Sequence, residues 1–239
     1  MRSNPTTSFP QFPSLDSLFQ SAAVVIPAYN ANDSLPQLFK RLQPFVEARQ
    51  IFVVDDGSSD ATAEVSSRAG ARVCRHDKNL GKGRALQTGF EAIRNTDFGF
   101  VVTMDADLQH QPEDLPSFFE IQRITKADIV LGRRPRLRTN MPLHRVLSNT
   151  VTSRLVSMRT GLAIQDSQCG FRLMRRNVID SVSLQSAGFE AETEFLIKAA
   201  KLGFTIGSVP VQTVYTNEKS SMSHWATTVG FVKVLLRDY

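Results

Sequence analysis

Two aspartates, Asp105 and Asp107, stand one residue apart directly after an apolar run. The run from Phe98 to Val102 predicts a strand buried on both faces. Alternate side chains of an extended chain point the same way, so both carboxylates can face one point past the strand's carboxyl end. Such a pair repels unless a cation or a shared proton lies between the two groups. The pair indicates a site for a hard divalent ion such as Mg²⁺, or else an acidic turn that caps the next helix.

Polar turns also follow two earlier strands, predicted for residues 22–26 and 51–54. The first strand leads into the rigid turn Pro27-Ala28-Tyr29-Asn30, and the second ends in Asp55-Asp56. Carboxyl ends of parallel strands share one sheet edge, so the three turns can line one pocket. Tyr29 could stack on a base, and Asp56 could accept hydrogen bonds from a base or a ribose. Jointly the turns indicate a nucleoside-diphosphate site with the metal on the pyrophosphate.

A glycine-rich turn, Asn79-Leu80-Gly81-Lys82-Gly83, precedes a helix predicted for residues 84–94. A lysine at the start of a helix would add positive charge near bound phosphates. An exposed loop lysine is the alternative interpretation of Lys82.

Strand and helix patterns alternate along the chain, which predicts an α/β fold with a mostly parallel central sheet flanked by helices. We expect a single domain over residues 21–223, after a flexible leader (1–20) whose apolar residues could dock on the body, and before an amphipathic tail (224–239). The other predicted elements are helices over residues 33–46, 59–69, 112–125, from 143 onward and 189–202, and strands over residues 71–75, 128–131 and 204–209.

Composition narrows the class of protein. The 239 residues carry a formal net charge of +5 and two cysteines, Cys74 and Cys169, in no metal or redox spacing, which favours a reducing cytosol. No apolar run approaches the roughly 20 residues that span a bilayer. The first residues lack the basic-then-apolar order of a signal peptide.

Between Asp128 and Asp166 the chain has no acidic residue. Three interpretations compete: a solvated helix face, a nucleic-acid site, and a membrane-surface segment that presents arginines to lipid phosphate. No aromatic residues interleave with the arginines for base stacking, which argues against nucleic acid. The arginines are Arg133, Arg134, Arg136, Arg138, Arg145, Arg154 and Arg159.

With these motifs the chain resembles the family 2 glycosyltransferases of the GT-A fold, and among them the dolichol- and polyprenyl-phosphate hexose synthases. The matching segments follow the family's order from about residue 22 to residue 223. They are Val25-Ile26-Pro27-Ala28-Tyr29-Asn30, Val53-Val54-Asp55-Asp56-Gly57-Ser58-Ser59-Asp60, Asn79-Leu80-Gly81-Lys82-Gly83, Met104-Asp105-Ala106-Asp107-Leu108-Gln109-His110, Leu131-Gly132-Arg133-Arg134, Asp166-Ser167-Gln168-Cys169-Gly170-Phe171-Arg172 and Glu192-Thr193-Glu194.

The resemblance implies roles for individual residues. Asp107, Arg134 and Asp166 would be catalytic, with Arg134 reaching toward phosphate or acceptor. Asp105, Asp107 and Gln109 would gather around Mg²⁺ or Mn²⁺. The nucleotide sugar would be bound by Pro27, Ala28, Tyr29, Asn30, Val54, Asp56, Lys82, Asp105, Ala106, Gln109 and Lys219.

The chain departs from the family pattern at two places. Ala31 stands where the family often has an acidic residue, which removes one expected ribose or base contact. The phosphate-binding Arg/Lys pair near the C-terminus of the archaeal synthase type has no match here. Lys219 is the only local cation in the sequence that could substitute.

The resemblance implies a metal-dependent, inverting transferase that moves a hexose from a nucleotide sugar (GDP-mannose or UDP-glucose type) to a polyprenyl phosphate. It would work peripherally on the cytoplasmic face of the membrane and would not bind nucleic acid. An acceptor hydroxyl, in cell-envelope glycan synthesis, is the alternative within the class; it would need a general base, for which Asp166, Glu192 and Glu194 are candidates. An alternative of another class is a sugar-nucleotide-binding protein without catalysis.

Overall fold

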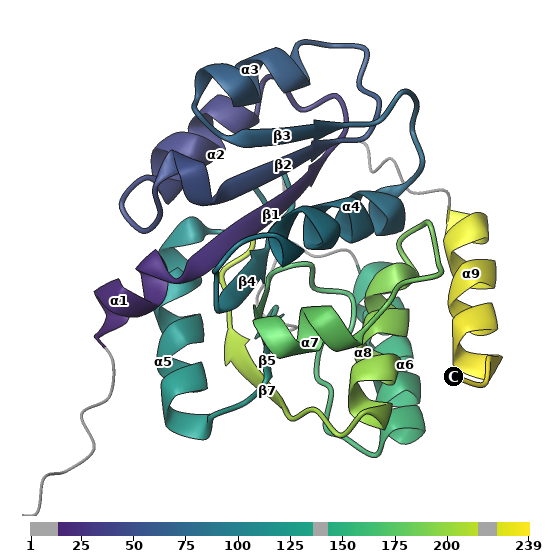
Figure 1. Cartoon of the computed structure of the whole chain (residues 1–239). Coiled ribbons are helices and arrows are strands. Elements are labelled where there is room, and N and C mark those ends of the chain that lie inside the picture. Colours follow the sequence, from purple (N-terminus) through teal and green to yellow (C-terminus); the bar gives the residue numbers. More distant parts are fainter. Residues whose placement is uncertain (1–13, 136–142, 215–223) are drawn as a thin grey trace, which may run out of the picture.

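The computed structural model describes residues 14–135, 143–214 and 224–239. Its centre is a seven-stranded sheet in the order β3-β2-β1-β4-β6-β5-β7 (Figure 1). This confirms the predicted α/β class with a mostly parallel sheet. The strands are β1 (Ala22–Ala28), β2 (Ile51–Asp55), β3 (Arg72–Arg75), β4 (Phe100–Thr103), β5 (Ile129–Arg133), β6 (Arg172–Arg175) and β7 (Ile206–Pro210).

Strand β1 pairs in parallel with both β2 and β4, so the carboxyl ends of these three strands meet at one sheet edge. In register, Ala28 lies beside Asp55 and Val25 beside Thr103. The predicted convergence of the three polar turns is therefore confirmed. Strand β6, to which the sequence patterns assigned no element, inserts antiparallel between β4 and β5.

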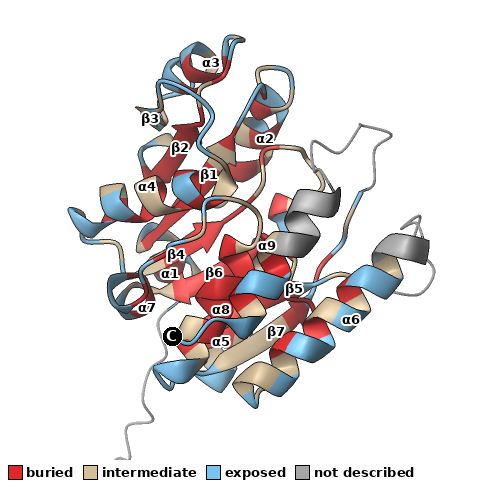
Figure 2. Cartoon of the chain, turned by 90° about the vertical axis from the view of Figure 1, so that its right-hand side faces the viewer, coloured by how far each residue is buried: buried red, intermediate tan, exposed pale blue. Residues whose placement is uncertain are grey.

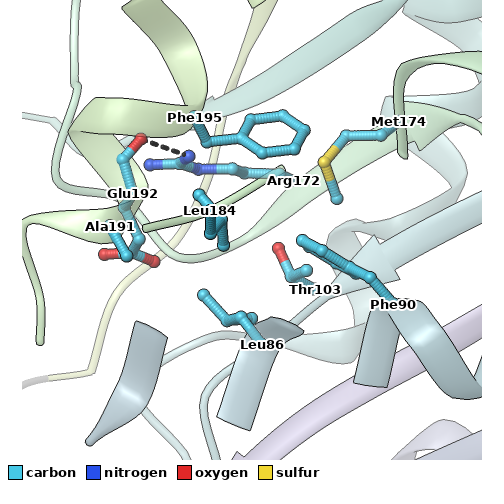
Figure 3. Close-up of a pocket in the computed structure, with 9 residues that line it drawn as sticks. All are labelled: Leu86, Phe90, Thr103, Arg172, Met174, Leu184, Ala191, Glu192 and Phe195. Atoms are coloured by element: carbon cyan, nitrogen blue, oxygen red, sulfur yellow. Dashed lines mark hydrogen bonds between the residues drawn. The ribbon is translucent and has the colours of Figure 1, made fainter. Parts of the chain in front are cut away.

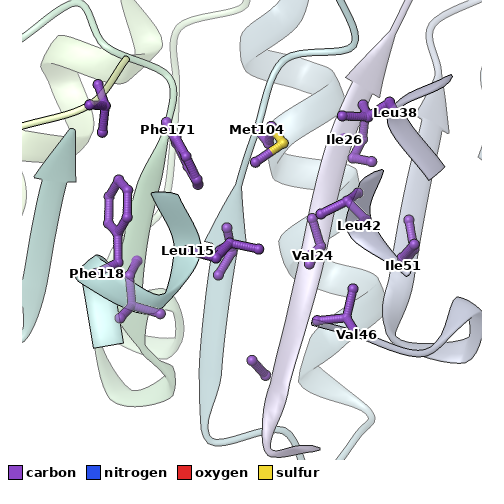
Figure 4. Close-up of a cluster of buried hydrophobic side chains, with 14 of the residues drawn as sticks. Val24, Ile26, Leu38, Leu42, Val46, Ile51, Met104, Leu115, Phe118 and Phe171 are labelled. Carbon is purple, nitrogen blue, oxygen red and sulfur yellow. The ribbon is translucent and has the colours of Figure 1, made fainter. Parts of the chain in front are cut away.

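Helices cover both faces of the sheet (Figures 1 and 2). Successive residues of β1 serve opposite faces: Val24 and Ile26 join one apolar core, and Ala23 and Val25 join the other. Figure 4 shows part of the first core, which α1, α2 and α5 close. The helices are α1 (Leu15–Gln20), α2 (Leu35–Leu42), α3 (Thr62–Arg68), α4 (Lys82–Arg94), α5 (Leu115–Thr125), α6 (Leu143–Thr160), α7 (Arg176–Ser181), α8 (Ala191–Lys201) and α9 (His224–Leu236), with 3-10 turns at Ala48–Gln50 and Pro112–Asp114.

The described residues nearest both chain ends pack on the body. Phe19 of α1 makes edge contacts with Phe45 and Phe119, at ring-centroid distances of 5.9 and 4.9 Å. Phe231 and Val234 of α9 are buried in the second core, where α9 lies against α6 and α8. None of the helices in the described parts of the chain is long and apolar enough to cross a membrane.

Candidate active site

The first acid of the pair, Asp105, is held by an ammonium group that comes from the start of α4. The Lys82 Nζ atom lies 2.6 Å from Asp105 Oδ1 and 3.1 Å from Glu192 Oε1 on α8. The Lys82 side chain is 14% exposed, so it is not an exposed loop lysine. Three segments distant in sequence, at residues 82, 105 and 192, thus meet in one ion cluster at the carboxyl edge of the sheet.

The charges of this cluster stabilise one another. Burial alone would lower the pKa of the Lys82 ammonium, but the carboxylates of Asp105 and Glu192 outweigh burial and raise that pKa. Burial alone would raise the pKa of Asp105, but the charge of Lys82 outweighs it and lowers that pKa to about 2. Asp105 is therefore ionised at neutral pH, and it shares the Lys82 ammonium with Glu192.

Gly170 leaves the space in which these carboxylates meet. A Cβ atom at residue 170 would lie 2.8 Å from Asp105 Oδ2 and 3.0 Å from Glu192 Oε1. The Gly170 carbonyl accepts a hydrogen bond of 2.7 Å from Thr103 Oγ1, which fixes the glycine beside the end of β4. A side chain at this position would have to displace at least one carboxylate.

A buried arginine anchors the helix that carries Glu192 (Figure 3). The Arg172 Nη1 atom donates to the Glu192 carbonyl at 2.9 Å, and its other donors reach the carbonyls of Cys169 and Ser167. Beneath Glu192 lies a small cavity of about 10 Å³, too small for a substrate. It is lined by Leu86, Phe90, Thr103, Arg172, Met174, Leu184, Ala191, Glu192 and Phe195.

The second acid, Asp107, lies in a turn that His110 supports. The Asp107 Oδ1 atom accepts a hydrogen bond of 3.0 Å from the Gln109 backbone N–H. The Asp105 backbone N–H donates to His110 Nδ1 at 3.3 Å, which requires an unprotonated nitrogen there. Burial of the His110 ring lowers its pKa to about 4, so the ring is neutral at pH 7. Sequence reasoning gave His110 no role; its position at the end of the acidic motif was the available signal.

The Asp56 carboxylate shapes the glycine-rich turn. It accepts hydrogen bonds from the Leu80 and Gly81 backbone N–H groups at 2.9 and 2.8 Å, and it lies 2.7 Å from His76 Nδ1. The other ring nitrogen of His76 lies 2.9 Å from Thr88 Oγ1 on α4. A carboxylate offers about four acceptor positions, and three of them are used here. Sequence reasoning missed His76, which no motif marked.

The first turn leaves an aromatic ring exposed at the same edge. The Asn30 backbone N–H donates to Ser58 Oγ, and Asn30 Oδ1 accepts from the Ser59 backbone N–H, both at 2.9 Å. These bonds tie the turn after β1 to the turn after β2, and Tyr29 remains 49% exposed. Pro27 and Ala28 lie at the end of β1, while the side chains of Val54 and Ala106 are buried.

Arg134 and Asp166 form a two-pronged ion pair at the end of β5. Arg134 Nε lies 2.8 Å from Asp166 Oδ2, and Arg134 Nη2 lies 2.9 Å from Asp166 Oδ1. The Asp166 side chain is 1% exposed. Burial alone would raise its pKa, but the hydrogen bonds and charge of Arg134 outweigh burial and lower it. Asp166 therefore orients Arg134.

A basic cleft opens beside this pair. Its volume is about 580 Å³, and it lies between the end of β5, α6 and the loop after α6. The expected phosphate contact of Lys219 cannot be placed, because residue 219 lies outside the described residues. The residues that line the cleft are Arg133, Arg134, Pro135, Ser153, Arg154, Ser157, Ala163, Ile164 and Gln165.

The donor chemistry around Asp107 fits a hard divalent ion that shares its ligands with a substrate. In the described parts of the chain, no three or more His, Cys, Asp or Glu side chains group as a metal site. Asp105 is already paired with Lys82. The carboxylate of Asp107 and the amide oxygen of Gln109 are hard oxygen donors that suit Mg²⁺ or Mn²⁺, since Mg²⁺ is commonly held by one or two carboxylates together with substrate phosphates and water.

Comparisons with known proteins agree with this geometry. The family model "Glycosyl transferase family 2" matches residues 23–183. An uncharacterized protein of Methanocaldococcus jannaschii is 32% identical over 219 residues, which cover 90% of this chain and 89% of that protein. The undecaprenyl-phosphate 4-deoxy-4-formamido-L-arabinose transferase of Salmonella paratyphi B is 32% identical over 175 residues. That match covers 68% of this chain and about half (51%) of the transferase.

A solved structure shares the fold. Glucosyl-3-phosphoglycerate synthase from Mycobacterium tuberculosis, crystallised with Mg²⁺ and UDP, superposes with a TM-score of 0.75 at 21% identity. The superposition covers 93% of this chain and 81% of the synthase. It confirms the predicted GT-A architecture.

Proposed function

The chain belongs to glycosyl transferase family 2 and is a glycosyltransferase, and on this premise we propose that it transfers a hexose from a nucleotide sugar to a polyprenyl phosphate. The donor would be of the GDP-mannose or UDP-glucose type. The acceptor phosphate would attack the anomeric carbon from the face opposite the diphosphate, with inversion. One sugar–oxygen bond forms while the bond to the nucleoside diphosphate breaks.

On the donor side, the three turns would hold the nucleotide at the sheet edge. The exposed ring of Tyr29 would stack on the base, and Asp56 would shape the glycine-rich turn beneath it. Asp107 and Gln109, with Asp105 behind them, would hold Mg²⁺ or Mn²⁺, which supplies positive charge to the departing diphosphate. Lys82 fixes Asp105 and adds a second positive charge at this end of the site.

The observation that supports a phosphate acceptor is the state of the candidate bases. Each of the three carboxylates already has a cationic partner: Asp166 has Arg134, Glu192 has Lys82, and Glu194 has Lys198. A paired carboxylate is a poor base, and a hydroxyl acceptor would need a good one. A phosphate is anionic at neutral pH and needs only positioning, which Arg134 and the basic cleft can supply.

The relatives support the same acceptor chemistry. The Salmonella relative is named for undecaprenyl phosphate, and the mycobacterial synthase shows that the shared fold can bind Mn²⁺ and UDP. Because polyprenyl phosphates reside in membranes, we place this chain peripherally on the cytoplasmic membrane face.

The test uses washed membranes, the purified protein and a radiolabelled nucleotide sugar. A glycosyl phosphate is labile to mild acid, so we expect a lipid-soluble product whose label is released by that treatment. An acid-stable lipid product would instead support a hydroxyl acceptor and would overturn the proposal.

A further inference from the structure

Helix α6 buries two polar side chains beside Val156 and exposes four large apolar side chains. Its buried positions include Asn149 and Ser153, which are 3% and 1% exposed. Large apolar side chains on the same helix face solvent, as the pale blue outer side of α6 in Figure 2 illustrates. Their exposed fractions are 67% for Leu147, 46% for Val151, 40% for Leu155 and 80% for Met158. Contiguous apolar exposure of this kind commonly marks an interaction site.

The inward polar residues have a structural purpose. The Ser153 hydroxyl accepts a hydrogen bond of 3.1 Å from the Ser167 backbone N–H and lies 3.1 Å from Asn149 Oδ1. The Ser157 hydroxyl accepts from the Ile164 backbone N–H at 3.0 Å. These bonds attach α6 to the loop that carries Asp166, the partner of Arg134. In the described parts of the chain, no such contact explains why the large apolar residues of α6 face solvent.

The four outward residues form one stripe. At 100° per residue, positions 147, 151, 155 and 158 fall within about a quarter of the helix circumference. Arg154 lies about 20° outside this arc, next to Leu147, and is exposed. We call Leu147, Val151, Leu155 and Met158 the α6 stripe. It is an apolar surface with a guanidinium group at one edge.

We propose that the α6 stripe docks on the surface of an anionic lipid bilayer; this deepens the proposed function and rests on it. In a lipid interface, Leu and Met side chains enter the acyl boundary while an arginine extends to the phosphates. The absence of acidic residues between Asp128 and Asp166 suits an anionic surface.

The position of Arg154 argues for lipid over a second copy of this chain. A symmetric contact through the α6 stripe would place Arg154 at the edge of the contact, with no acid on either helix to pair with its charge. Burying a charge without a partner is costly. Lipid phosphates instead supply the partner.

The docked helix would also orient the cleft. Arg154 borders the α6 stripe and also lines the basic cleft that contains Arg133 and Arg134. With α6 on the bilayer, the cleft would adjoin the lipid headgroups, where the phosphate of a polyprenyl phosphate lies. The α6 stripe would thus bring the active site to its acceptor.

Vesicle flotation tests the docking surface. We expect the wild-type protein to float with vesicles of equal parts phosphatidylcholine and phosphatidylglycerol, less with phosphatidylcholine alone, and less at high salt. Leu147→Glu/Met158→Glu should reduce the partition coefficient about tenfold or more. The matched control is Ile124→Glu/Leu202→Glu, which changes two residues that are 64% and 57% exposed outside α6. The control should float like the wild type, and circular dichroism should show both variants folded.

Transfer to a short-chain, water-soluble prenyl phosphate separates this proposal from the proposed function. If the α6 variant loses flotation but still transfers the sugar to the soluble acceptor, the docking surface and the proposed function are both supported. If the α6 variant loses flotation and neither it nor the wild type transfers the sugar, only the docking surface is supported. Wild-type protein that does not float, or an α6 variant that floats like the wild type, overturns the docking surface. A change from dimer to monomer in light scattering as the only effect of the α6 variant would also overturn it, because the α6 stripe would then be a dimer interface.

Discussion

Asp105 and Asp107 stand one residue apart but have different surroundings. Asp105 is paired with Lys82 and stays ionised, with its pKa lowered to about 2 by that ammonium despite burial. Asp107 lies in the turn that continues to Gln109. Asp105 therefore belongs to the ion cluster with Lys82, and Asp107 is the acid that we propose as the metal ligand.

Replacing Asp107 should abolish metal-dependent transfer while preserving the fold. For Asp107→Ala we expect kcat to fall by about a hundredfold or more, since charge stabilisation of the leaving group is lost. The thermal midpoint should stay close to that of the wild type. Asp33→Ala, at an exposed position, is the control. Full turnover by Asp107→Ala would show that the metal assignment is wrong.

Gly170→Ala should disturb the ion cluster without touching the substrate. The added methyl would lie 2.8 Å from Asp105 Oδ2, so the carboxylates must shift. A misplacement of about 1 Å near the reacting atoms can lower the rate by about a hundredfold, so we expect kcat to fall about tenfold to a hundredfold. Gly99→Ala is the matched control, since a Cβ there meets nothing within 4 Å. Equal rates for the two variants would contradict the role given to the cluster.

Arg134→Ala should impair use of the acceptor more than use of the donor. Loss of a charge-assisted contact costs about 1.5–3 kcal/mol, so the acceptor KM should rise about tenfold or more while the donor KM stays near the wild-type value. The change also leaves Asp166 buried without its partner, so Arg134→Lys serves as a second variant and should recover part of the acceptor affinity. Equal increases in both KM values would rule out an acceptor role.

Site residues that lie close together in the sequence could be predicted as a group, and those that lie far apart could not. Asp105, Asp107 and Gln109 could be grouped because one short motif carries them. Glu192 and Gly170 lie far from Lys82 in sequence, so the ion cluster could not be foreseen. The partner of Asp166 could not be predicted either, since the sequence offers many arginines between residues 133 and 159.

At the scale of elements, the loop before α8 supports the start of α4. The Gly83 backbone N–H donates to the Ala187 carbonyl at 2.7 Å, and a Cβ at residue 83 would clash with the Ser186 carbonyl oxygen. The Glu194 carboxylate in turn accepts hydrogen bonds from the Gln185 and Ser186 backbone N–H groups. Glu194, a candidate general base from sequence, therefore holds the loop that positions Lys82.

The stability contributed by Glu194 should depend on pH. Burial would raise the pKa of this carboxyl, but Lys198 and the two backbone donors outweigh burial and lower it. A group with a lowered folded-state pKa adds stability above its unfolded pKa of about 4.3, and this stability is lost as the pH falls through the folded-state pKa. Glu194→Gln should lower the free energy of unfolding by about 2 kcal/mol at neutral pH and by progressively less in acid.

Urea unfolding at several pH values measures this difference. Glu91→Gln, at an exposed position on α4, should change stability little at any pH. A Glu194→Gln penalty that stays constant down to acid pH would show that the carboxylate charge contributes nothing.

Elements with strong periodic patterns were predictable, and β6 was not. Apolar runs marked β1, β2, β4 and β5, and their polar ends marked the site. Strand β6 has arginine at both ends, and Arg172 fits in the interior only because carbonyls of Ser167, Cys169 and Glu192 accept its hydrogen bonds. Those acceptors belong to tertiary structure, which local patterns do not reveal.

At the scale of the whole molecule, the donor edge and the basic cleft are joined by one continuous set of contacts. The donor edge is built by β1, β2 and β4, and the cleft by β5 and α6. The loop from Asp166 to Phe171 connects them, because Asp166 holds Arg134 while Gly170 accommodates Asp105. Strand alternation predicted the layers, whereas the exposure of the apolar residues of α6 to solvent emerged only from the folded chain.

Release of nucleoside diphosphate is the most direct measure of phosphate as the acceptor. The purified protein would be given UDP-glucose or GDP-mannose and Mg²⁺, with either a short-chain polyprenyl phosphate or the corresponding polyprenol. We expect release from one donor with the phosphate, background release with the alcohol, and none after EDTA treatment. Equal release with the alcohol, or release unaffected by EDTA, would contradict metal-dependent transfer to a phosphate.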